Sequence, residues 1–276
     1  MTKEEARTQF AEMAARSDEL IELDRAALLI AAEEYRQLEL APYLAMLDEF
    51  AAGVRAMKAV DARARVTALG EYLFQWRGFQ GNTTDYYDAR NSFLSDVLER
   101  KTGIPITLSV VYIEVARRLG LRMRGVGMPG HFLVRYEDEE GELIIDAFHG
   151  GKVLSMEQCR ELFAGLYGAG VAFTPGFLSA VSARQILIRM LRNLKGIYAR
   201  AGAHRQTLGT IERVLLLDPD LPEEIRDRGL ARAGLREYAA GLRDLEQYLR
   251  LRPGAGDAAR IREKIGELKK GQARLN

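Results

Sequence analysis

Two of the chain's three histidines flank a carboxylate in a stretch that is typical of a β-hairpin. An acidic turn centred on residues 138 and 139 would place residues whose numbers sum to 277 opposite each other, so His131 would face Asp146. Facing side chains have Cβ atoms roughly 4.5–5.5 Å apart, which lets the carboxylate accept a hydrogen bond from the imidazole. Such a carboxylate fixes the tautomer of the ring, as in a catalytic triad. The pair predicts either a general acid or base at His131 or a core histidine satisfied by Asp146.

The residues around this pair favour a functional site at one end of the sheet. Pro129 and Gly130 precede His131, and two glycines follow His149. We interpret His149 either as a polar pocket residue or as a turn residue bonded to its own backbone. Two histidines and an aspartate could also ligate zinc. They fit a site without metal as well, and we expect neither a metal nor another cofactor.

A long apolar helix and three short strands are predicted to position these side chains. The helix begins near Pro105 and ends at Gly120, with apolar residues on nearly every side, so it belongs in a domain centre. Residues 121–128, 131–136 and 142–148 are strand candidates. With helices expected in the first eighty residues, the sequence predicts an α+β domain. A helical N-terminal part would precede a central helix on a small antiparallel sheet.

One carboxylate interrupts the apolar helix. Glu114 lies among its aliphatic residues, and a buried carboxylate needs a partner. We expect a structural ion pair, with Arg124 or Arg135 as the cation.

The last third of the chain repeats itself at an interval of 34 residues. The sequence Leu-Leu-Leu-Asp-Pro at residues 215–219 recurs as Leu-Arg-Leu-Arg-Pro at residues 249–253. This interval is the tetratricopeptide period, in which each unit is a helix pair. The sequence therefore predicts an all-α domain of such repeats over residues 182–276, closed by a polar helix, after a first domain over residues 1–181.

The composition is that of an ordinary globular protein, with 47% hydrophobic residues, 29% charged residues and a net charge of +1. It gives no reason to expect nucleic acid as a partner, and no apolar run approaches the roughly 20 residues of a membrane span. The 20 basic and 12 acidic side chains of residues 182–276 give that part a charge of +8, which could attract an acidic partner or simply cover solvated helix faces. A single cysteine and a charged start without a signal-peptide core lead us to expect a cytoplasmic protein.

Three motifs followed by the repeats resemble the SirB-type family, in which a transglutaminase-like (papain-like) domain precedes tetratricopeptide repeats. The motifs are GNTTDYYDARNSFLSDVLERKTGIPITLSVVYIEVARRLGL, GVGMPGHFLVRY and DAFHGG. The resemblance implies a cysteine nucleophile at the start of the buried helix, a histidine that opens one strand and an aspartate that ends the next. His131 and Asp146 match the last two positions.

The nucleophile position does not match. It falls near residues 105–107, where the sequence is Pro-Ile-Thr. Thr107 and Ser109 have hydroxyls, but an alcohol needs strong activation before it attacks a carbonyl. Cys159 comes after the aspartate, in a predicted helix, and we expect it to be a buried structural cysteine.

We expect first a non-catalytic binding or regulatory module that has lost the cysteine. Its cleft would hold a peptide or another acyl-containing ligand, with Asn91, Tyr112 and His149 as ligand-binding residues. The repeats would bind a protein or peptide partner.

Two other hypotheses remain open. One is an acyl-transfer or amide-hydrolysing enzyme, in which His131 activates water or the hydroxyl of Thr107 or Ser109 while Asp146 orients the ring. The other places the function in the repeats and leaves the first domain as a scaffold.

Overall fold

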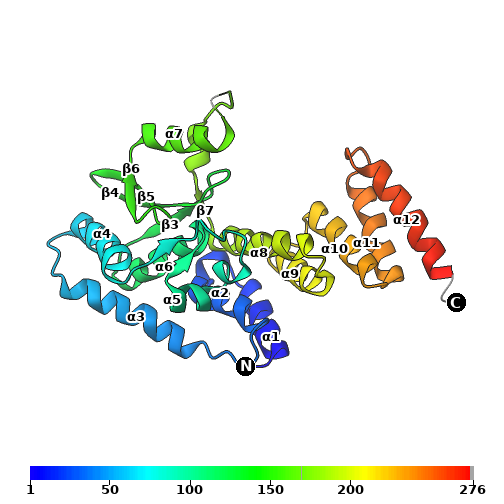
Figure 1. Cartoon of the computed structure of the whole chain (residues 1–276), viewed down its shortest axis with the longest axis horizontal. Coiled ribbons are helices and arrows are strands. Elements are labelled where there is room, and N and C mark those ends of the chain that lie inside the picture. The colour runs from blue at the N-terminus through cyan, green and yellow to red at the C-terminus, as the bar shows by residue number, and fades with distance from the viewer. Residues whose placement is uncertain (169, 274–276) are drawn as a thin grey trace. The chain divides into compact units, whose positions relative to one another are not determined.

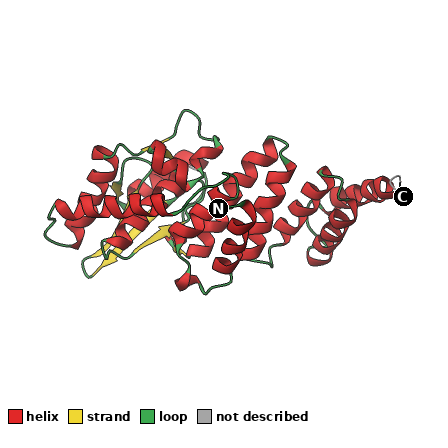
Figure 2. Ribbon diagram, turned by 90° about the horizontal axis from the view of Figure 1, so that it is seen from below, coloured by secondary structure: helices red, strands yellow, loops and turns green. Residues whose placement is uncertain are grey.

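The computed structural model describes residues 1–168 and 170–273, which divide into two compact units, Met1–Met190 and Leu191–Asn276. The division falls inside helix α8 (Ala183–Arg200), which begins just after the boundary expected between residues 181 and 182. Helices dominate both units, and every strand of the described chain precedes α8 (Figures 1 and 2). The expected order, an α+β domain followed by helical repeats, is confirmed.

The first unit consists of helices around a small sheet. Its α-helices are α1 (Lys3–Ala14), α2 (Leu23–Ala32), α3 (Ala41–Ala56), α4 (Ala62–Gly70), α5 (Leu94–Arg100), α6 (Pro105–Arg118) and α7 (Met156–Tyr167). Shorter helical turns are η1 (Asp18–Leu20), the π-helical η2 (Glu71–Trp76), η3 (Ala89–Asn91) and η4 (Pro175–Leu178). The strands are β1 (Gln80–Gly81), β2 (Thr102–Gly103), β3 (Met123–Val126), β4 (Leu133–Asp138), β5 (Gly141–Asp146), β6 (Lys152–Leu154) and β7 (Ala180–Val181).

Helix α6 is the centre of this unit. Its residues from Pro105 to Ala116 are all buried, and it packs against β3 and β4. Pro105 occupies a first-turn position that needs no N–H donor, and the hydroxyl of Thr107 accepts the N–H of Ile104, which satisfies the helix start. The sheet beside it is antiparallel, with strand order β6-β5-β4-β3-β7, and β1 and β2 form a separate parallel pair. The predicted central helix on a small antiparallel sheet is confirmed.

The β4–β5 hairpin has a different register from the predicted one. Its facing residues, such as Val134 and Ile145, have numbers that sum to 279 rather than 277. The predicted register was wrong because Asp138 is the last residue of β4 and does not lie at the centre of the turn. The Asp138 carboxylate is bound there by Arg63 of α4, with Nη2 of Arg63 2.7 Å from Oδ1 of Asp138. A shift by two residues keeps the same side chains on the same face, because side chains alternate along a strand.

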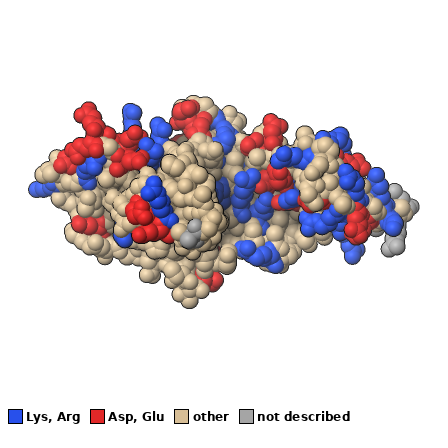
Figure 3. Space-filling view, turned by 90° about the horizontal axis from the view of Figure 1, so that it is seen from above, with Lys and Arg blue, Asp and Glu red and all other residues tan. Residues whose placement is uncertain are grey.

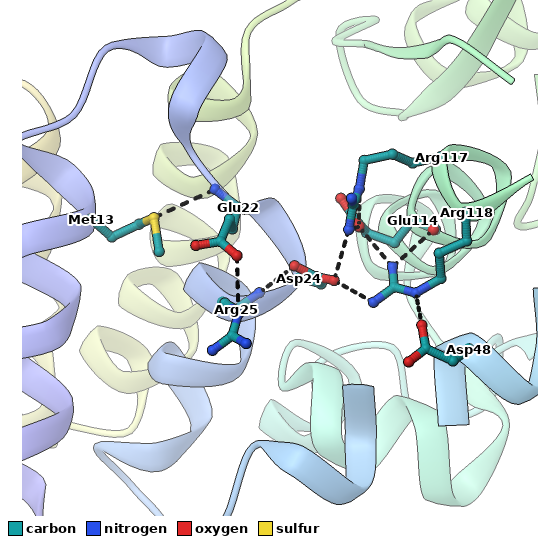
Figure 4. A network of polar contacts seen from close by, with 8 residues as sticks. All are labelled: Met13, Glu22, Asp24, Arg25, Asp48, Glu114, Arg117 and Arg118. Atoms are coloured by element: carbon teal, nitrogen blue, oxygen red, sulfur yellow. Dashed lines mark hydrogen bonds and ion pairs between the residues drawn. The ribbon is translucent and has the colours of Figure 1, made fainter. Parts of the chain in front are cut away.

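A buried ion network joins α6 to α2 (Figure 4). Glu114 binds the guanidinium groups of Arg117 at 2.8 Å and Arg118 at 3.0 Å. Asp24 of α2 binds the same two groups, at 3.1 Å from Arg117 and 2.6 Å from Arg118. Asp48 of α3 adds a contact of 2.6 Å to Arg118 at the surface.

The structural ion pair expected for Glu114 is confirmed, but the expected cations, Arg124 and Arg135, were wrong. The partners lie three and four residues further along the same helix, where side chains meet most easily. Burial and the neighbouring charge of Asp24 raise the pKa of Glu114 to about 7. For Asp24 burial works in the same direction, but the hydrogen bond and charge of Arg118 outweigh it and lower the pKa.

The second unit contains, besides the end of α8, the helices α9 (His204–Leu217), α10 (Pro222–Gly234), α11 (Tyr238–Leu251) and α12 (Ala258–Ala273). Helices α9 and α11 begin and end 34 residues apart, at 204 and 238 and at 217 and 251. The turns before them contain Gly202 and Arg236, also 34 apart, whose φ angles are +65° and +62°. The predicted repeat is confirmed at the level of individual backbone angles.

Basic and acidic side chains lie intermixed over this unit on the face that Figure 3 shows. Many are paired, as in the contacts of Arg228 and Arg232 with Asp244. None of the helices within residues 1–168 and 170–273 is both long and apolar enough to cross a membrane.

Candidate functional site

His131 and Asp146 are in contact at one end of the sheet. The ring nitrogen Nε2 of His131 lies 3.0 Å from both carboxylate oxygens of Asp146. His131 precedes β4 by two residues, whereas Asp146 ends β5, and both side chains are buried, with 5% and 1% exposed. The predicted contact is confirmed, and it forms although the two residues do not pair in the ladder.

Asp146 is the acceptor for several groups. Its Oδ1 accepts the backbone N–H groups of Phe148 at 3.0 Å and His149 at 3.2 Å, and its Oδ2 lies 2.7 Å from Nδ1 of His149. Burial works to raise the pKa of this carboxyl, but the hydrogen bonds and charges of the two histidines outweigh it and lower the pKa. An ionised carboxylate can accept hydrogen bonds but cannot donate them. The Nε2 atom of His131 therefore carries the proton in its contact with Asp146.

That tautomer makes the second ring nitrogen of neutral His131 an acceptor. Within the described residues, Nδ1 of His131 has no hydrogen-bond partner and is not among the fully buried unpaired atoms. A buried imidazole with one nitrogen fixed by a carboxylate and the other open can accept a proton or a hydrogen bond from a ligand.

His149 connects this pair to the surface. Its ring stacks on that of His131 with centroids 5.6 Å apart, and 53% of its side chain is exposed. The sequence left open whether His149 would be a pocket residue or a turn residue. Its ring and its backbone N–H both bind the carboxylate of Asp146, and no hydrogen bond of the described residues joins the ring to its own backbone. The ligand-binding role of His149 stays a prediction.

His131, Asp146 and His149 could also hold a metal ion, because each offers one ligand atom and these atoms lie within 4.8 Å of one another. The Asp146 carboxylate is already bonded to both rings, whereas Nδ1 of His131 has no partner among the described residues. The absence of a metal stays a prediction.

A row of aromatic rings leads from the surface to His131. The centroid distances are 5.3 Å from Tyr87 to Tyr86, 6.3 Å from Tyr86 to Phe148, and 6.0 Å from Phe148 to His131. The exposed fraction falls inward, from 63% at Tyr87 to 39% at Tyr86 and 5% at His131. Gly81 makes room for this row, because a Cβ atom there would lie 2.6 Å from the ring of Phe148. These rings form one wall of the site.

Arg189 of α8 holds the loop that carries His131. Its Nη2 donates to the backbone carbonyl oxygens of His131 at 2.6 Å and Met128 at 3.1 Å, and its guanidinium lies 5.3 Å from the ring centroid of Phe132. Sequence reasoning missed this residue. The pattern that could have indicated it is a single arginine among neighbouring apolar residues, which are Ile186, Leu187, Ile188, Met190 and Leu191.

The predicted residues Thr107 and Asn91 bind each other. The Thr107 hydroxyl lies 2.7 Å from the carbonyl oxygen of Asn91, to which it donates. The Asn91 side chain donates to the carbonyl oxygen of Asp85 at 2.7 Å and accepts from Asn82 at 3.1 Å. These bonds fasten the loop that carries Tyr86 to the start of α6, and the predicted roles of both residues in catalysis or binding stay predictions.

Three other residues singled out from the sequence are buried. The hydroxyl of Tyr112 donates to the carbonyl oxygen of Val66 at 2.8 Å, and the Ser109 hydroxyl is buried without a hydrogen-bond partner among the described residues. No hydrogen bond or ring contact within the described chain joins either residue to His131. Cys159 is buried in an apolar cluster with Leu133 and Phe163, as expected, and burial raises its pKa.

Comparisons with known proteins agree with the two units. The Transglutaminase-like superfamily matches residues 41–192, and the Tetratricopeptide repeat family matches residues 194–266. A UPF0162 protein of Xylella fastidiosa is 38% identical over 256 residues, which cover 91% of each chain. A UPF0162 protein of Vibrio cholerae is 27% identical over 75% of this chain and 77% of its own.

A similarity over a shorter stretch reaches a different kind of protein. F-box only protein 21 of Mus musculus is 33% identical over 62% of this chain, which corresponds to 28% of that protein. No solved structure matches.

Proposed function

The chain belongs to the transglutaminase-like superfamily and to the UPF0162 family, and on this premise we propose that its first unit binds a peptide or another acyl-containing ligand without catalysing its conversion. The ligand would lie against Nδ1 of His131 and the rings of Tyr86 and Phe148. The second unit would bind a protein or peptide partner.

The observation that carries this proposal is the bonding of Thr107. The family resemblance puts the nucleophile at the start of α6, and the one hydroxyl there donates at 2.7 Å to the carbonyl oxygen of Asn91. A hydroxyl held in this way also completes the helix start, and it would have to give up both bonds to reach a substrate. Pro105 and Ile106 have no nucleophilic atom, and Cys159 is buried elsewhere.

The His131–Asp146 pair would then serve recognition. Its orientation leaves Nδ1 as an acceptor for an N–H or O–H group, and peptide N–H groups supply such donors. The rings beside it offer apolar area for an adjacent side chain. A site that combines one oriented polar atom with aromatic walls is typical of small-ligand and peptide sites.

The proposed partner surface of the second unit includes a cavity of about 280 Å³ between repeat helices. It is lined by Lys195, Ala199, His204, Thr207, Asp227 and Leu230. Lys195 is paired with Glu224 and Asp227, both at 2.8 Å, so the cavity offers mainly apolar contacts rather than a free charge. Repeat arrays commonly bind partners on such surfaces.

One observation favours the catalytic alternative. Asp146 is held ionised and orients His131, which is the arrangement that activates a water molecule in acyl chemistry. In that case the enzyme would hydrolyse an ester or amide with water as the nucleophile.

A paired assay separates the two proposals. Wild type and His131→Ala would be incubated with an activated ester and with glutamine-containing peptides plus an amine, and products would be counted by mass spectrometry. The binding proposal expects no product above the level of His131→Ala. Turnover that His131→Ala abolishes and His204→Ala retains would establish the catalytic alternative, since His204 is the third histidine and lies in the second unit. Loss of that turnover in Thr107→Val would point to the hydroxyl rather than water.

A further inference from the structure

Arg189 carries a positive charge that no carboxylate in the described chain neutralises. Its hydrogen-bond partners are the two backbone carbonyl oxygens of His131 and Met128, and it makes no ion pair with any described residue. Other partly buried arginines of this protein, such as Arg118 and Arg226, each bind at least one carboxylate. A partly buried cation without a counter-charge is costly to keep, which makes an external anion a favourable partner.

The guanidinium also has donors to spare. Both bonds to the loop come from Nη2, and neither Nε nor Nη1 has a hydrogen-bond partner or is fully buried among the described residues. Gly127 leaves space beside Nη1, because a Cβ atom built there would lie 3.4 Å from it. The Nη1 group can donate to one oxygen of a carboxylate, whereas the two-point fork of Nε–H with Nη2–H is not open, because Nη2 is already bound to the loop.

Two phenols lie near this charge. Burial lowers the pKa of the Arg189 guanidinium, and the nearby Tyr86 and Tyr167 oppose this shift. The Tyr167 hydroxyl would lie 3.1 Å from a Cβ atom at Gly130, the residue before His131. Arg189 and Tyr167 therefore lie beside the loop that presents His131, and Tyr86 belongs to the aromatic row.

We propose that Arg189 and the aromatic row beside His131 form a subsite for the C-terminal carboxylate of a peptide that ends in an aromatic residue. This rests on the proposed function, in which the site binds a peptide. One oxygen of the carboxylate binds Nη1 of Arg189, the terminal N–H donates to Nδ1 of His131, and the aromatic side chain lies against Tyr86 and Phe148. The carboxylate, the N–H and the aromatic side chain all belong to the last residue of such a peptide. One residue of the ligand could therefore contact Arg189, His131 and the aromatic row together.

N-acetyl-L-phenylalanine is the smallest probe with all three features, and its primary amide is the matched control without the charge. Both would be titrated into the full chain while NMR follows the ring signals of His131 and the Nε–H signal of Arg189. We expect the acid to bind at least about tenfold more tightly than the amide, because charge-assisted hydrogen bonds are roughly twice as strong as neutral ones. Arg189→Gln should bring the two affinities together, and Arg189→Lys should retain part of the difference.

The control variant is Arg160→Gln, at an exposed arginine of α7 that pairs only with its neighbour Glu157 among the described residues; it should bind both compounds as wild type does. Equal affinities of acid and amide for wild type would overturn the carboxylate subsite and leave the proposed binding function standing. If neither compound shifts the His131 signals, both proposals fail. The comparison of acid with amide needs only wild type, so it decides the matter even if Arg189→Gln does not fold.

A third compound separates the two sources of a carboxylate. A tripeptide amide with an internal aspartate next to phenylalanine carries its charge on a side chain. Weaker binding than N-acetyl-L-phenylalanine supports the terminal carboxylate, and tighter binding overturns that assignment.

Discussion

Asp24 and Arg118 hold α2 against α6, with Oδ2 of Asp24 2.6 Å from Nη2 of Arg118 and only 3% and 12% of their side chains exposed. Helix α6 also provides the wall behind β3 and β4. The contact therefore connects the N-terminal helices to the element that supports the His131 site.

Removing the charge of Asp24 should destabilise the protein strongly. In Asp24→Asn, Arg118 loses the closer of its two buried partners and keeps Glu114, and breaking a buried ion pair from one side typically costs about 3 kcal/mol of unfolding free energy. Urea denaturation measures the change. The matched control is Asp48→Asn, which removes the exposed partner of the same arginine and should cost at most about 1 kcal/mol. Similar losses in the two variants would contradict this reading of the network.

Glu114 should make stability fall as pH rises towards neutrality. Burial and Asp24 raise its folded pKa to about 7, whereas an unfolded glutamate titrates near about 4.3. Between these values the folded state binds more protons than the unfolded state, so the unfolding free energy decreases with rising pH, and the effect is complete above the folded pKa. Urea denaturation from about pH 5 to about pH 8 should show a decline in wild type that is smaller in Glu114→Gln, by roughly 3 kcal/mol over the interval. Parallel curves for the two proteins would exclude Glu114 as the source.

Asp146 should stabilise the fold as a hydrogen-bond acceptor as well as through its negative charge. Asp146→Ala leaves the backbone N–H groups of Phe148 and His149 and both imidazoles without their acceptor, and we expect a loss of about 3 kcal/mol of unfolding free energy. Asp146→Asn keeps one acceptor oxygen and should lose less. Hydrogen exchange at residues 148 and 149 reports the difference directly, with faster exchange in the alanine variant than in the asparagine variant. Identical exchange in both would mean that Oδ1 does not hold these groups.

Arg236 should be a site where glycine stabilises. Its φ angle of +62° strains an L-residue, and the equivalent position one repeat earlier is Gly202. We expect Arg236→Gly to raise the unfolding free energy by about 0.5–1 kcal/mol. Arg243→Gly, at an exposed position in the middle of α11, should have the opposite sign because glycine weakens a helix interior by a similar amount. A destabilised Arg236→Gly would show that the arginine side chain makes contacts that outweigh the strain.

Periodicity accounts for most of what the sequence predicts correctly. The 34-residue interval needs no long-range information, and it reappears in the bounds of α9 and α11 and in the φ angles of Gly202 and Arg236. The contact of His131 with Asp146 requires only that both residues lie at the same end of two paired strands, His131 just before β4 and Asp146 at the end of β5. It therefore survives the two-residue error in register.

What the sequence does not predict depends on contacts between distant segments. Arg63 and Asp138, 75 residues apart, are joined beside the hairpin turn, and Arg189 reaches a carbonyl oxygen 58 residues earlier. Neither pair has a local signal. Glu114 differs, because its arginine partners are three and four residues away, and only the contribution of Asp24 from a separate helix has no local signal.

The single, fully buried cysteine makes this protein a convenient starting point for site-selective labelling. Cys159 is 0% exposed and the pKa of its thiol is raised, so maleimides should react with it slowly while the chain is folded. A cysteine introduced at an exposed residue, such as Tyr87 or Arg260, would then be the one fast-reacting thiol of the folded protein. Fluorophores attached there could follow ligand capture in solution without first mutating the native residue.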